Sequence, residues 1–304
     1  MISCLIFLDP GSLGRFQYIT AGALIIFFLG FKDDIIGTSP AKKFLVQIIA
    51  SLIVIILGDI RFTSLHGFLG IYGISALAGI SLTLVTMVGI TNCFNLMDGI
   101  DGLSGGLGVI ASVSFGLYFY SAGDYRWSVM MASITGALVS FLYFNVFADR
   151  YKIFMGDTGS LVLGFLLAVT AVKFNETVLS APAGLSMAAA PAVSIGILII
   201  PIFDTLRVAV TRLINLRSPF MPDKTHIHHY LLELIHSHRL SSLVLILAAF
   251  LFCLVSYCLR NTPVSLLLVI LIAMAAVLFY IPIYLVNKRK PASDNKSKKS
   301  PLSP

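Results

Sequence analysis

The stretch Ile74–Leu103, ISALAGISLTLVTMVGITNCFNLMDGIDGL, joins an uncharged apolar run directly to a cluster of amides and acids. The run from Ile74 to Thr91 approaches the roughly 20 residues that a helix needs to cross a bilayer. Ionisable groups at membrane depth are costly and usually functional. The stretch therefore predicts a membrane helix that ends in a functional site, whose candidate residues are Asn92, Asn95, Asp98 and Asp101.

Composition extends this prediction to the whole chain. Of its 304 residues, 58% are hydrophobic and 12% are charged, and the mean hydropathy is +0.95. A soluble domain carries about 25% charged residues. The chain is therefore predicted to be a polytopic membrane protein without room for a large soluble domain. The net charge of +7 indicates cytoplasmic loops rather than nucleic-acid binding, because Lys and Arg gather on the cytoplasmic side of membrane proteins.

Nine apolar runs predict an all-α transmembrane helix bundle of about nine spans, which makes residues 1–286 one transmembrane catalytic domain. The run Leu161–Val172 is short, and we expect its helix to extend into its flanks. The runs are Phe16–Phe31, Phe44–Gly58, Ile74–Thr91, Ser104–Ala122, Ser128–Phe147, Leu161–Val172, Gly184–Phe203, Ser242–Leu259 and Val264–Val286.

Lysine and arginine predict the orientation. When the loops after the odd-numbered spans share one side, that side holds sixteen Lys and Arg and the other side five. This split predicts a cytoplasmic C-terminus in a multi-pass inner (plasma) membrane protein. The basic tail 287–304 is predicted to be disordered and to contact anionic lipid. All the polar clusters then fall on the cytoplasmic side, in loops 31–43, 92–103, 148–160 and 204–241, although no acid was used to set the orientation.

The first cluster is Asp33-Asp34, with Lys43 at the start of the next run. Two carboxylates in close contact raise the pKa of one of them, which suits a general base. Ordinary charges in a solvated loop are an equal alternative. Lys43 could neutralise a phosphate, although for a single lysine an anchor of the helix at the membrane surface is the favoured explanation.

The spacing of Asn92, Asn95, Asp98 and Asp101 by three residues makes a polar stripe that drifts along one side of a helix. Their oxygens suit Mg²⁺, with hydrogen bonding between membrane helices as the alternative.

The third cluster is Gly156-Asp157-Thr158-Gly159. Free amides at the start of a helix could bind an anion or a metal phosphate here, or Asp157 or Thr158 could cap that helix.

The last cluster is His226-Ile227-His228-His229. No cysteine or acid completes a familiar zinc spacing around these imidazoles. Hydrogen bonding of a diphosphate or a sugar by His226, His228 and His229 is the favoured function. The alternative is a solvated amphipathic helix over Thr225–His236, which explains His236 and His238 better.

In this order and spacing the clusters resemble the motifs of the polyprenyl-phosphate N-acetylhexosamine-1-phosphate transferases, a glycosyltransferase 4 family. The similarity runs from about Phe31 to Glu233, and the form HIHH is similar to the WecA/TagO branch. The matching stretches are Gly30–Asp34 with Lys43-Phe44, Asn92–Leu103, Phe154–Leu161, and Ser218-Pro219-Phe220 with His226–His229.

The resemblance implies transfer of an N-acetylhexosamine-1-phosphate, typically from UDP-GlcNAc, to undecaprenyl phosphate, with release of UMP, as the first membrane step of an envelope polysaccharide. It implies Mg²⁺, with Mn²⁺ as a substitute, held by Asn95 and Asp157. Asp33 or Asp34 would deprotonate or position the lipid phosphate, and Lys43 would neutralise phosphate charge. Asp98 and Asp101 would lie beside the nucleotide, with Asn92 in substrate binding, while His226, His228 and His229 would bind the diphosphate or the sugar.

One departure concerns the N-terminus. The resemblance implies two further spans and a basic segment before the Asp pair, whereas 32 residues precede Asp33, so we expect an N-terminal truncation. An ion-coupled transporter and a non-catalytic truncated relative are the competing hypotheses. The acids lie at the ends of spans rather than in their middles, which disfavours an ion relay. The identity of the sugar and a homodimeric state both stay open.

Overall fold

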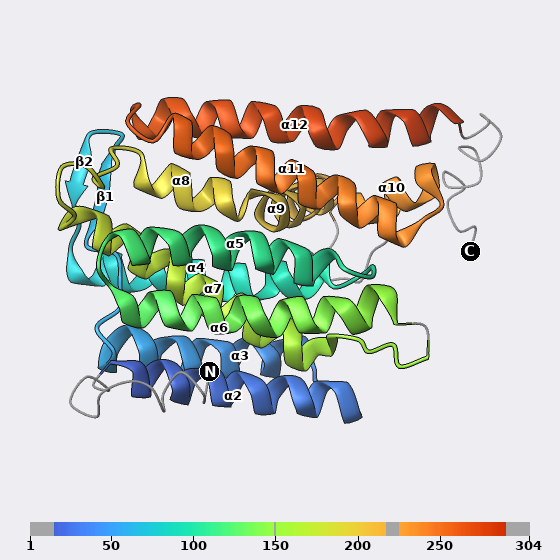
Figure 1. Ribbon diagram of the computed structural model, residues 1–304, viewed down its shortest axis with the longest axis horizontal. Coiled ribbons are helices and arrows are strands. Elements are labelled where there is room, and N and C mark those ends of the chain that lie inside the picture. Colours follow the sequence, from blue (N-terminus) through green and yellow to red (C-terminus); the bar gives the residue numbers. More distant parts are fainter. Residues whose placement is uncertain (1–14, 149, 217–224, 290–304) are drawn as a thin grey trace.

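The computed structural model describes residues 15–148, 150–216 and 225–289, which form a bundle of long helices (Figure 1). The predicted all-α polytopic fold is confirmed. Its helices are α2 (Phe16–Ile36), α3 (Pro40–Leu52), α4 (Ala76–Met97), α5 (Leu103–Ser121), α6 (Tyr125–Leu142), α7 (Gly156–Leu179), α8 (Ala190–Ile197), α9 (Ile199–Ile214), α10 (Ile227–Ile235), α11 (His238–Cys258) and α12 (Val264–Arg289). Two π-helical segments, η2 (Ile53–Leu57) and η3 (Tyr143–Phe147), extend α3 and α6.

Within the described residues, seven helices are long and apolar enough to cross a membrane, and α8 with α9 would make an eighth as one broken span. The multi-pass architecture is thus confirmed, with fewer spans than the nine predicted. The first predicted span corresponds to α2, which is not among the seven. Its last turns carry Lys32, Asp33 and Asp34, so the helix runs past its apolar segment into the polar end of the bundle.

Helix α7 lies at the centre of the bundle. Its residues from Ser160 to Asn175 are all buried except Val162 and Lys173, and it packs against α2 and α4. The short run Leu161–Val172 does extend into both flanks, because neighbouring helices shield the polar residues at its ends. The first turn of α7 therefore brings Asp157 to the end of the bundle that lies on the right in Figure 1.

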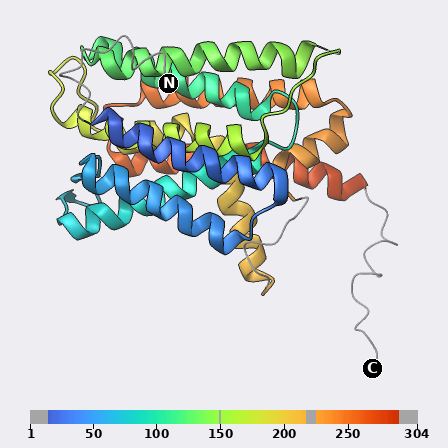
Figure 2. The ribbon, with the colours of Figure 1, turned by 90° about the horizontal axis from the view of Figure 1, so that it is seen from below.

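The predicted seventh span, Gly184–Phe203, is not one continuous helix. It is broken at Leu198, where α8 and α9 meet at 82°, and α9 leaves the side of the bundle in Figure 2. Pro201 explains the position of the break, since it lacks the N–H that would bond to the carbonyl of Ile197, and its ring would collide with that carbonyl. The chain therefore ends α8 at Ile197 and begins a new helix.

The hairpin β1 (Ser64–Phe68) and β2 (Ile71–Gly73) lies at the other end of the bundle (Figure 1). Phe68 pairs with Ile71 across a two-residue turn of Leu69 and Gly70, both with positive φ, 53° and 80°. These angles are those of a type I′ turn, which suits a tight hairpin. The hairpin is a small addition that composition did not predict.

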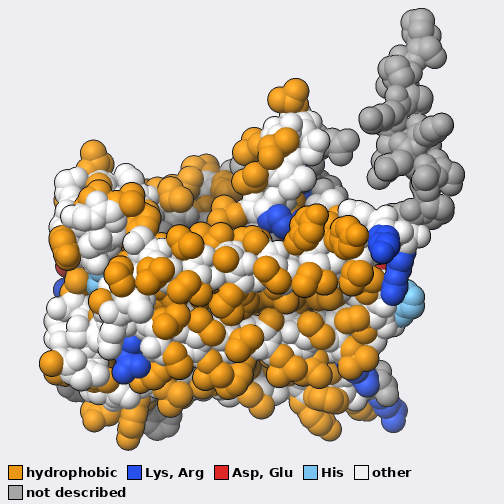
Figure 3. Space-filling model, turned by 90° about the horizontal axis from the view of Figure 1, so that it is seen from above, with side chains coloured by type: hydrophobic (Ala, Val, Ile, Leu, Met, Phe, Trp, Pro, Cys, Tyr) orange, Lys and Arg blue, Asp and Glu red, His pale blue; other side chains and the backbone are white. Residues whose placement is uncertain are grey.

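The flanks of the bundle are apolar. In Figure 3 hydrophobic side chains cover the length of the visible face and Lys and Arg are sparse. Leu, Ile, Val and Phe side chains on the outer faces of α2, α4, α11 and α12 are exposed, as expected for helices that contact lipid. These flanks therefore suit contact with lipid rather than polar chemistry.

Candidate active site

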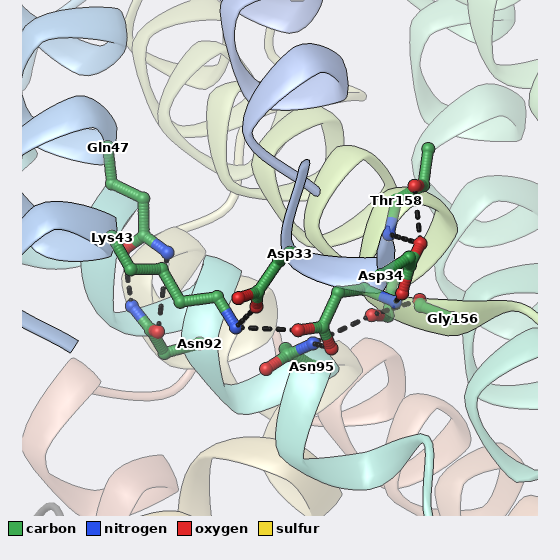
Figure 4. Close-up of polar contacts among 10 residues, drawn as sticks. Asp33, Asp34, Lys43, Gln47, Asn92, Asn95, Gly156 and Thr158 are labelled. Atoms are coloured by element: carbon green, nitrogen blue, oxygen red, sulfur yellow. Dashed lines mark hydrogen bonds and ion pairs between the residues drawn. The ribbon is translucent and has the colours of Figure 1, made fainter. Parts of the chain in front are cut away.

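Four helix termini meet at one end of the bundle. The C-terminal turns of α2 and α4 lie beside the N-terminal turns of α3 and α7 (Figures 1 and 4). The predicted site loops are thus largely helix ends: residues 31–36, 40–43, 92–97 and 156–160 are all helical. Helices fix the direction of these side chains more firmly than loops would.

Lys43 of α3 lies between two carboxylates. Its Nζ is 2.5 Å from Oδ2 of Asp33 and 2.8 Å from Oδ2 of Asp157. The Nδ2 of Asn95 donates to Oδ1 of Asp157 at 2.6 Å and to Oγ of Ser160 at 2.9 Å. The structure therefore brings together Asp33, Lys43, Asn95 and Asp157, four residues that the sequence predicted for one site and that come from four helices. Figure 4 labels the first three.

Asp34 points in a different direction from Asp33. Its Oδ1 accepts from the amide of Asp157 at 2.8 Å, and its Oδ2 accepts from the amide and the hydroxyl of Thr158 at 3.0 and 2.5 Å. Asp34 thus caps the start of α7 from another helix, where a negative charge also complements the helix dipole. The alternative that Asp157 or Thr158 caps this helix is wrong, because both residues lie within the first turn of α7 and the acceptor comes from Asp34. A role for Asp34 toward a lipid phosphate stays a prediction.

Asn92 bonds to a neighbouring helix. Its amide exchanges hydrogen bonds with that of Gln47 at 2.6 and 3.3 Å and donates to the carbonyl of Val88 at 2.7 Å. Gln47 is buried, so this pair joins α3 to α4 inside the bundle. The contact is the helix-to-helix bonding that the sequence left open, and substrate binding by Asn92 stays a prediction.

Asp98 and Asp101 flank the turn between α4 and α5. Burial, with the negative charge of Asp157 beside it, raises the pKa of Asp98 from 3.8 to about 6. Asp101 pairs with Lys152 at 2.6 Å, and its carbonyl accepts from Ser242. Gly102 has a φ of 79° and its amide donates to Asn145. The turn is thus fixed from η3 and α11, and it carries one acid, Asp98, whose pKa is raised.

The predicted histidines gather at the start of α10. His226 and His228 are buried, with 5% and 1% of their surface exposed, whereas His236 and His238 are exposed. The solvated-helix alternative therefore fits only the last two. Burial, with the neighbouring imidazole of His229, lowers the pKa of His228 to about 3, so that ring is neutral. A Cβ on Gly99 would overlap Nε2 of His228, which puts this ring against the Asp98 turn.

The sequence reasoning missed Asp204. Its carboxylate is fully buried in α9 and lies 2.8 Å from Nδ1 of His226. The available signal was a single acid within the apolar stretch Ile195–Leu206, the pattern that marks a paired or functional group in a membrane helix. The motif Ser218-Pro219-Phe220 and the tail beyond Arg289 lie outside the described residues.

Comparison with known proteins identifies the family of the chain. The family described as "Glycosyl transferase family 4" matches residues 16–175. The chain belongs to glycosyl transferase family 4. It is 33% identical over 261 residues to the "Probable undecaprenyl-phosphate N-acetylglucosaminyl 1-phosphate transferase" of Bacillus subtilis, an alignment that covers 84% of this chain and 69% of that one.

Two further relatives carry related names. The "Decaprenyl-phosphate N-acetylglucosaminephosphotransferase" of Mycolicibacterium smegmatis is 33% identical over 78% of this chain and 61% of its own. The "Undecaprenyl-phosphate alpha-N-acetylglucosaminyl 1-phosphate transferase" of Salmonella typhi is 29% identical over 47% of this chain and 38% of its own. This member of glycosyl transferase family 4 thus spans less than two thirds of the second and third of these relatives.

The oxygen donors around Lys43 can be compared with those that a divalent metal requires. Within the described residues, no three His, Cys, Asp or Glu side chains converge as a ligand group, and the ammonium of Lys43 contacts both Asp33 and Asp157. Mg²⁺ needs no such group, since one or two carboxylates commonly bind it with waters and substrate phosphates. Asp157, which keeps 34% of its side chain exposed, and the amide oxygen of Asn95 fit that requirement.

Proposed function

We propose that this protein transfers an N-acetylhexosamine-1-phosphate, with GlcNAc-1-phosphate the leading candidate, from a UDP-sugar to undecaprenyl phosphate and releases UMP. The observation that carries the proposal is the position of Lys43, 2.5 Å from Asp33 and 2.8 Å from Asp157. A cation between two carboxylates at the end of a membrane bundle suits a reaction between phosphates. The names of the relatives support the same chemistry.

In the reaction, an oxygen of the lipid phosphate attacks the β-phosphorus of the UDP-sugar. The bond from that phosphorus to the bridging oxygen breaks, so UMP leaves with the electron pair and the lipid diphosphate sugar remains. Phosphoryl transfer of this kind depends on positioning and charge neutralisation rather than on covalent help from the protein. Lys43 would neutralise the incoming phosphate charge, and Asp33 would position the lipid phosphate or accept its proton.

The structure divides the two acids of the first cluster. Asp33 faces Lys43, whereas both oxygens of Asp34 are used by the start of α7. We therefore assign the contact with the lipid phosphate to Asp33 and the placement of Asp157 to Asp34. Asp98, Asp101, His226, His228 and His229 would bind the nucleotide, the diphosphate or the sugar.

Mg²⁺ is part of the proposal, with Mn²⁺ as a substitute. When bound it would supply positive charge to the diphosphate. Asp157 and Asn95 are the residues we assign to it, because their oxygens are hard donors at the rim of the cluster. Lys43 would then share Asp157 with the ion, and the site needs both cations because four acids, Asp33, Asp34, Asp98 and Asp157, lie close together.

The location of the site supports its partners. One substrate is a lipid and the other is soluble, so the reaction belongs at a membrane face, and the positive-inside distribution favours the cytoplasmic face of the inner membrane. The transporter alternative needs acids near the middle of the spans. The cluster of Lys43, Asp33, Asp157 and Asn95 lies instead at the helix ends, where ion pairs and a hydrogen bond join these residues.

Exchange of labelled UMP into UDP-GlcNAc in membranes tests the proposal. Asp157→Asn should abolish exchange while the protein still accumulates, and Mg²⁺ removal should do the same in the unchanged protein. Asp124→Asn is the matched control, because Asp124 pairs with Lys173 at 3.7 Å, away from the four converging helix ends. Full exchange by Asp157→Asn would reject the metal assignment, and no exchange by the unchanged protein would reject the activity.

A further inference from the structure

Asp204 is a buried carboxylate with both oxygens hydrogen-bonded. Its Oδ2 lies 2.8 Å from Nδ1 of His226, and its Oδ1 accepts from the amide of Ile227 at 3.0 Å and from Arg207 at 2.8 Å. No part of its side chain is exposed. An isolated buried charge would be very costly, so these donors explain how an acid is tolerated in α9.

The break in the predicted seventh span puts Asp204 in this position. After the 82° bend, the buried face of α9 carries Asp204, Val208 and Arg212 at intervals of four residues. Arg207 also donates to the carbonyl of Thr225, the residue before His226. The segment that carries His226 is therefore held by two neighbouring side chains of α9.

This arrangement defines which nitrogen of His226 carries the proton. An ionised carboxylate only accepts hydrogen bonds, so Nδ1 of His226 donates to Asp204, and in the neutral ring the lone pair is then on Nε2. The ring is also parallel to that of His228, with 5.8 Å between centroids and 7° between planes. Both the tautomer and the plane of the ring are thus fixed before any substrate binds.

We infer that Asp204 is a positioning residue, which holds His226 in the Nδ1–H tautomer and presents Nε2 as a hydrogen-bond acceptor to a hydroxyl of the sugar in the UDP-substrate. The inference rests on the proposed function. It adds a residue beyond the matched segment 16–175. Partners that orient a metal-binding histidine commonly change activity by about 10- to 100-fold when removed, and we expect a loss of the same order for a partner that orients His226.

A purely structural role is the competing explanation, because Asp204 also caps α10 through the amide of Ile227. The two oxygens separate these roles. Oδ1 serves the cap and Arg207, while Oδ2 serves His226 alone among the contacts of the described residues. Asn has the same shape but one acceptor oxygen, which the amide of Ile227 and Arg207 would retain. Its NH₂ group would then face His226 and force that ring into the Nε2–H tautomer.

The test uses the full chain in lipid nanodiscs with Asp204→Asn. We expect kcat for UMP exchange to fall about 10- to 100-fold while KM for UDP-GlcNAc stays within about twofold, because every substrate contact except that of Nε2 is retained. Nitrogen-15 NMR of histidine-labelled protein should show the His226 signal change from Nδ1–H to Nε2–H, assigned by its loss in His226→Gln. An unchanged tautomer with unchanged kcat would overturn the inference.

His226→Asn covers the case in which Asp204→Asn does not fold. Its side-chain amide can still donate to Asp204, so the cap and the fold are kept while Nε2 is lost. Exchange near the unchanged level would overturn the inference, and so would an Nε2–H tautomer of His226 in the unchanged protein. The NMR result requires no activity. A protein without exchange but with the expected tautomers would therefore reject the proposed function and leave the orienting contact established.

Discussion

Gly30 of α2 lies so close to α7 that a Cβ at this position would be 2.5 Å from the Cα of Thr158. Asp34 follows Gly30 by one helical turn and so lies on the same face of α2. The close approach lets Asp34 bond to the amides of Asp157 and Thr158 at 2.8 and 3.0 Å. Because Gly30 has no side chain, α2 can approach α7 closely enough for Asp34 to hold the first turn of α7, which carries Asp157.

Gly30→Ala is expected to separate α2 from α7 and to weaken the cap. Overpacking of this kind costs about 1–3 kcal/mol, and a lost cap about 1 kcal/mol. Asp33 and Lys43 would move relative to Asp157, so UMP exchange should fall at least about tenfold. Thermal unfolding and exchange measure the two effects. Gly136→Ala is the control, since a Cβ there has nothing within 4 Å; equal behaviour of the two variants would contradict the packing argument.

Changing Asp33 or Asp34 to the matching amide should have different effects on activity and on stability. Asp33→Asn leaves the cap of α7 intact and removes a partner of Lys43, so exchange should be lost with little change in thermal unfolding. Asp34→Asn removes the charge that faces the amides of Asp157 and Thr158, and it should lower stability by about 1 kcal/mol with a smaller direct effect on catalysis. The reverse pattern would show that Asp34 is the acid that contacts substrate.

Lys43→Met should abolish measurable exchange, with a loss of roughly 100-fold or more. It removes the charge between Asp33 and Asp157, which then repel each other across a half-buried site. Lys43→Arg should recover little, because the wider guanidinium cannot occupy the place of an ammonium. Lys173→Met, which breaks the pair with Asp124, is the control. Recovery of Lys43→Met by raised Mg²⁺ would indicate that a metal can take over the role of the lysine.

Much of the site was predictable because its residues are adjacent to long apolar runs. Asp33, Lys43, Asn95 and Asp157 each end or begin a helix, so their convergence required only that the helices pack in parallel and antiparallel rows. Asp204 was not predictable in this way. Its partner His226 comes from a different helix, and the bend that makes their contact possible depends on Pro201 within an otherwise spanning stretch.

The sequence also could not predict the different roles of the neighbouring acids Asp33 and Asp34. Asp33 and Asp34 are identical in chemistry, and only the approach of α2 to α7 at Gly30 directs one to Lys43 and the other to backbone amides. The same holds for Asn92, whose partner Gln47 lies within an apolar run of α3. Patterns along one chain identify the polar residues, whereas helix packing decides which of them meet.

Gly99→Ala should act through His228. A Cβ at Gly99 would overlap Nε2 of this buried ring, so the imidazole must turn away from the Asp98 turn. We expect exchange to fall by about tenfold or more, and the effects of Gly99→Ala and His228→Ala should not add, because both remove the same contact. The double variant measures this. Additive losses would mean that the glycine is needed for the backbone of the turn.

Asp98 gives a prediction with a defined pH dependence. Its pKa is raised from 3.8 to about 6 by burial and by the charge of Asp157. Below the lower value the folded and unfolded states both hold the proton, and the shift has no effect on stability. Between the two values the unfolded chain loses the proton first, so the folded state loses stability as pH rises, up to about pH 6.

Asp98→Asn cannot ionise and avoids this loss. The variant should therefore unfold at a higher temperature than the unchanged protein in metal-free buffer, and the difference in unfolding temperature should be larger at about pH 7.5 than at about pH 4.5. Exchange should be lost in the variant at every pH, and in the unchanged protein it should fall as pH drops through about 6, because the acid that the nucleotide site uses becomes neutral. If the variant and the unchanged protein differed in stability by the same amount at both pH values, the pKa of Asp98 would not be raised in the folded state. That result would contradict the influence of burial and of Asp157 on this acid.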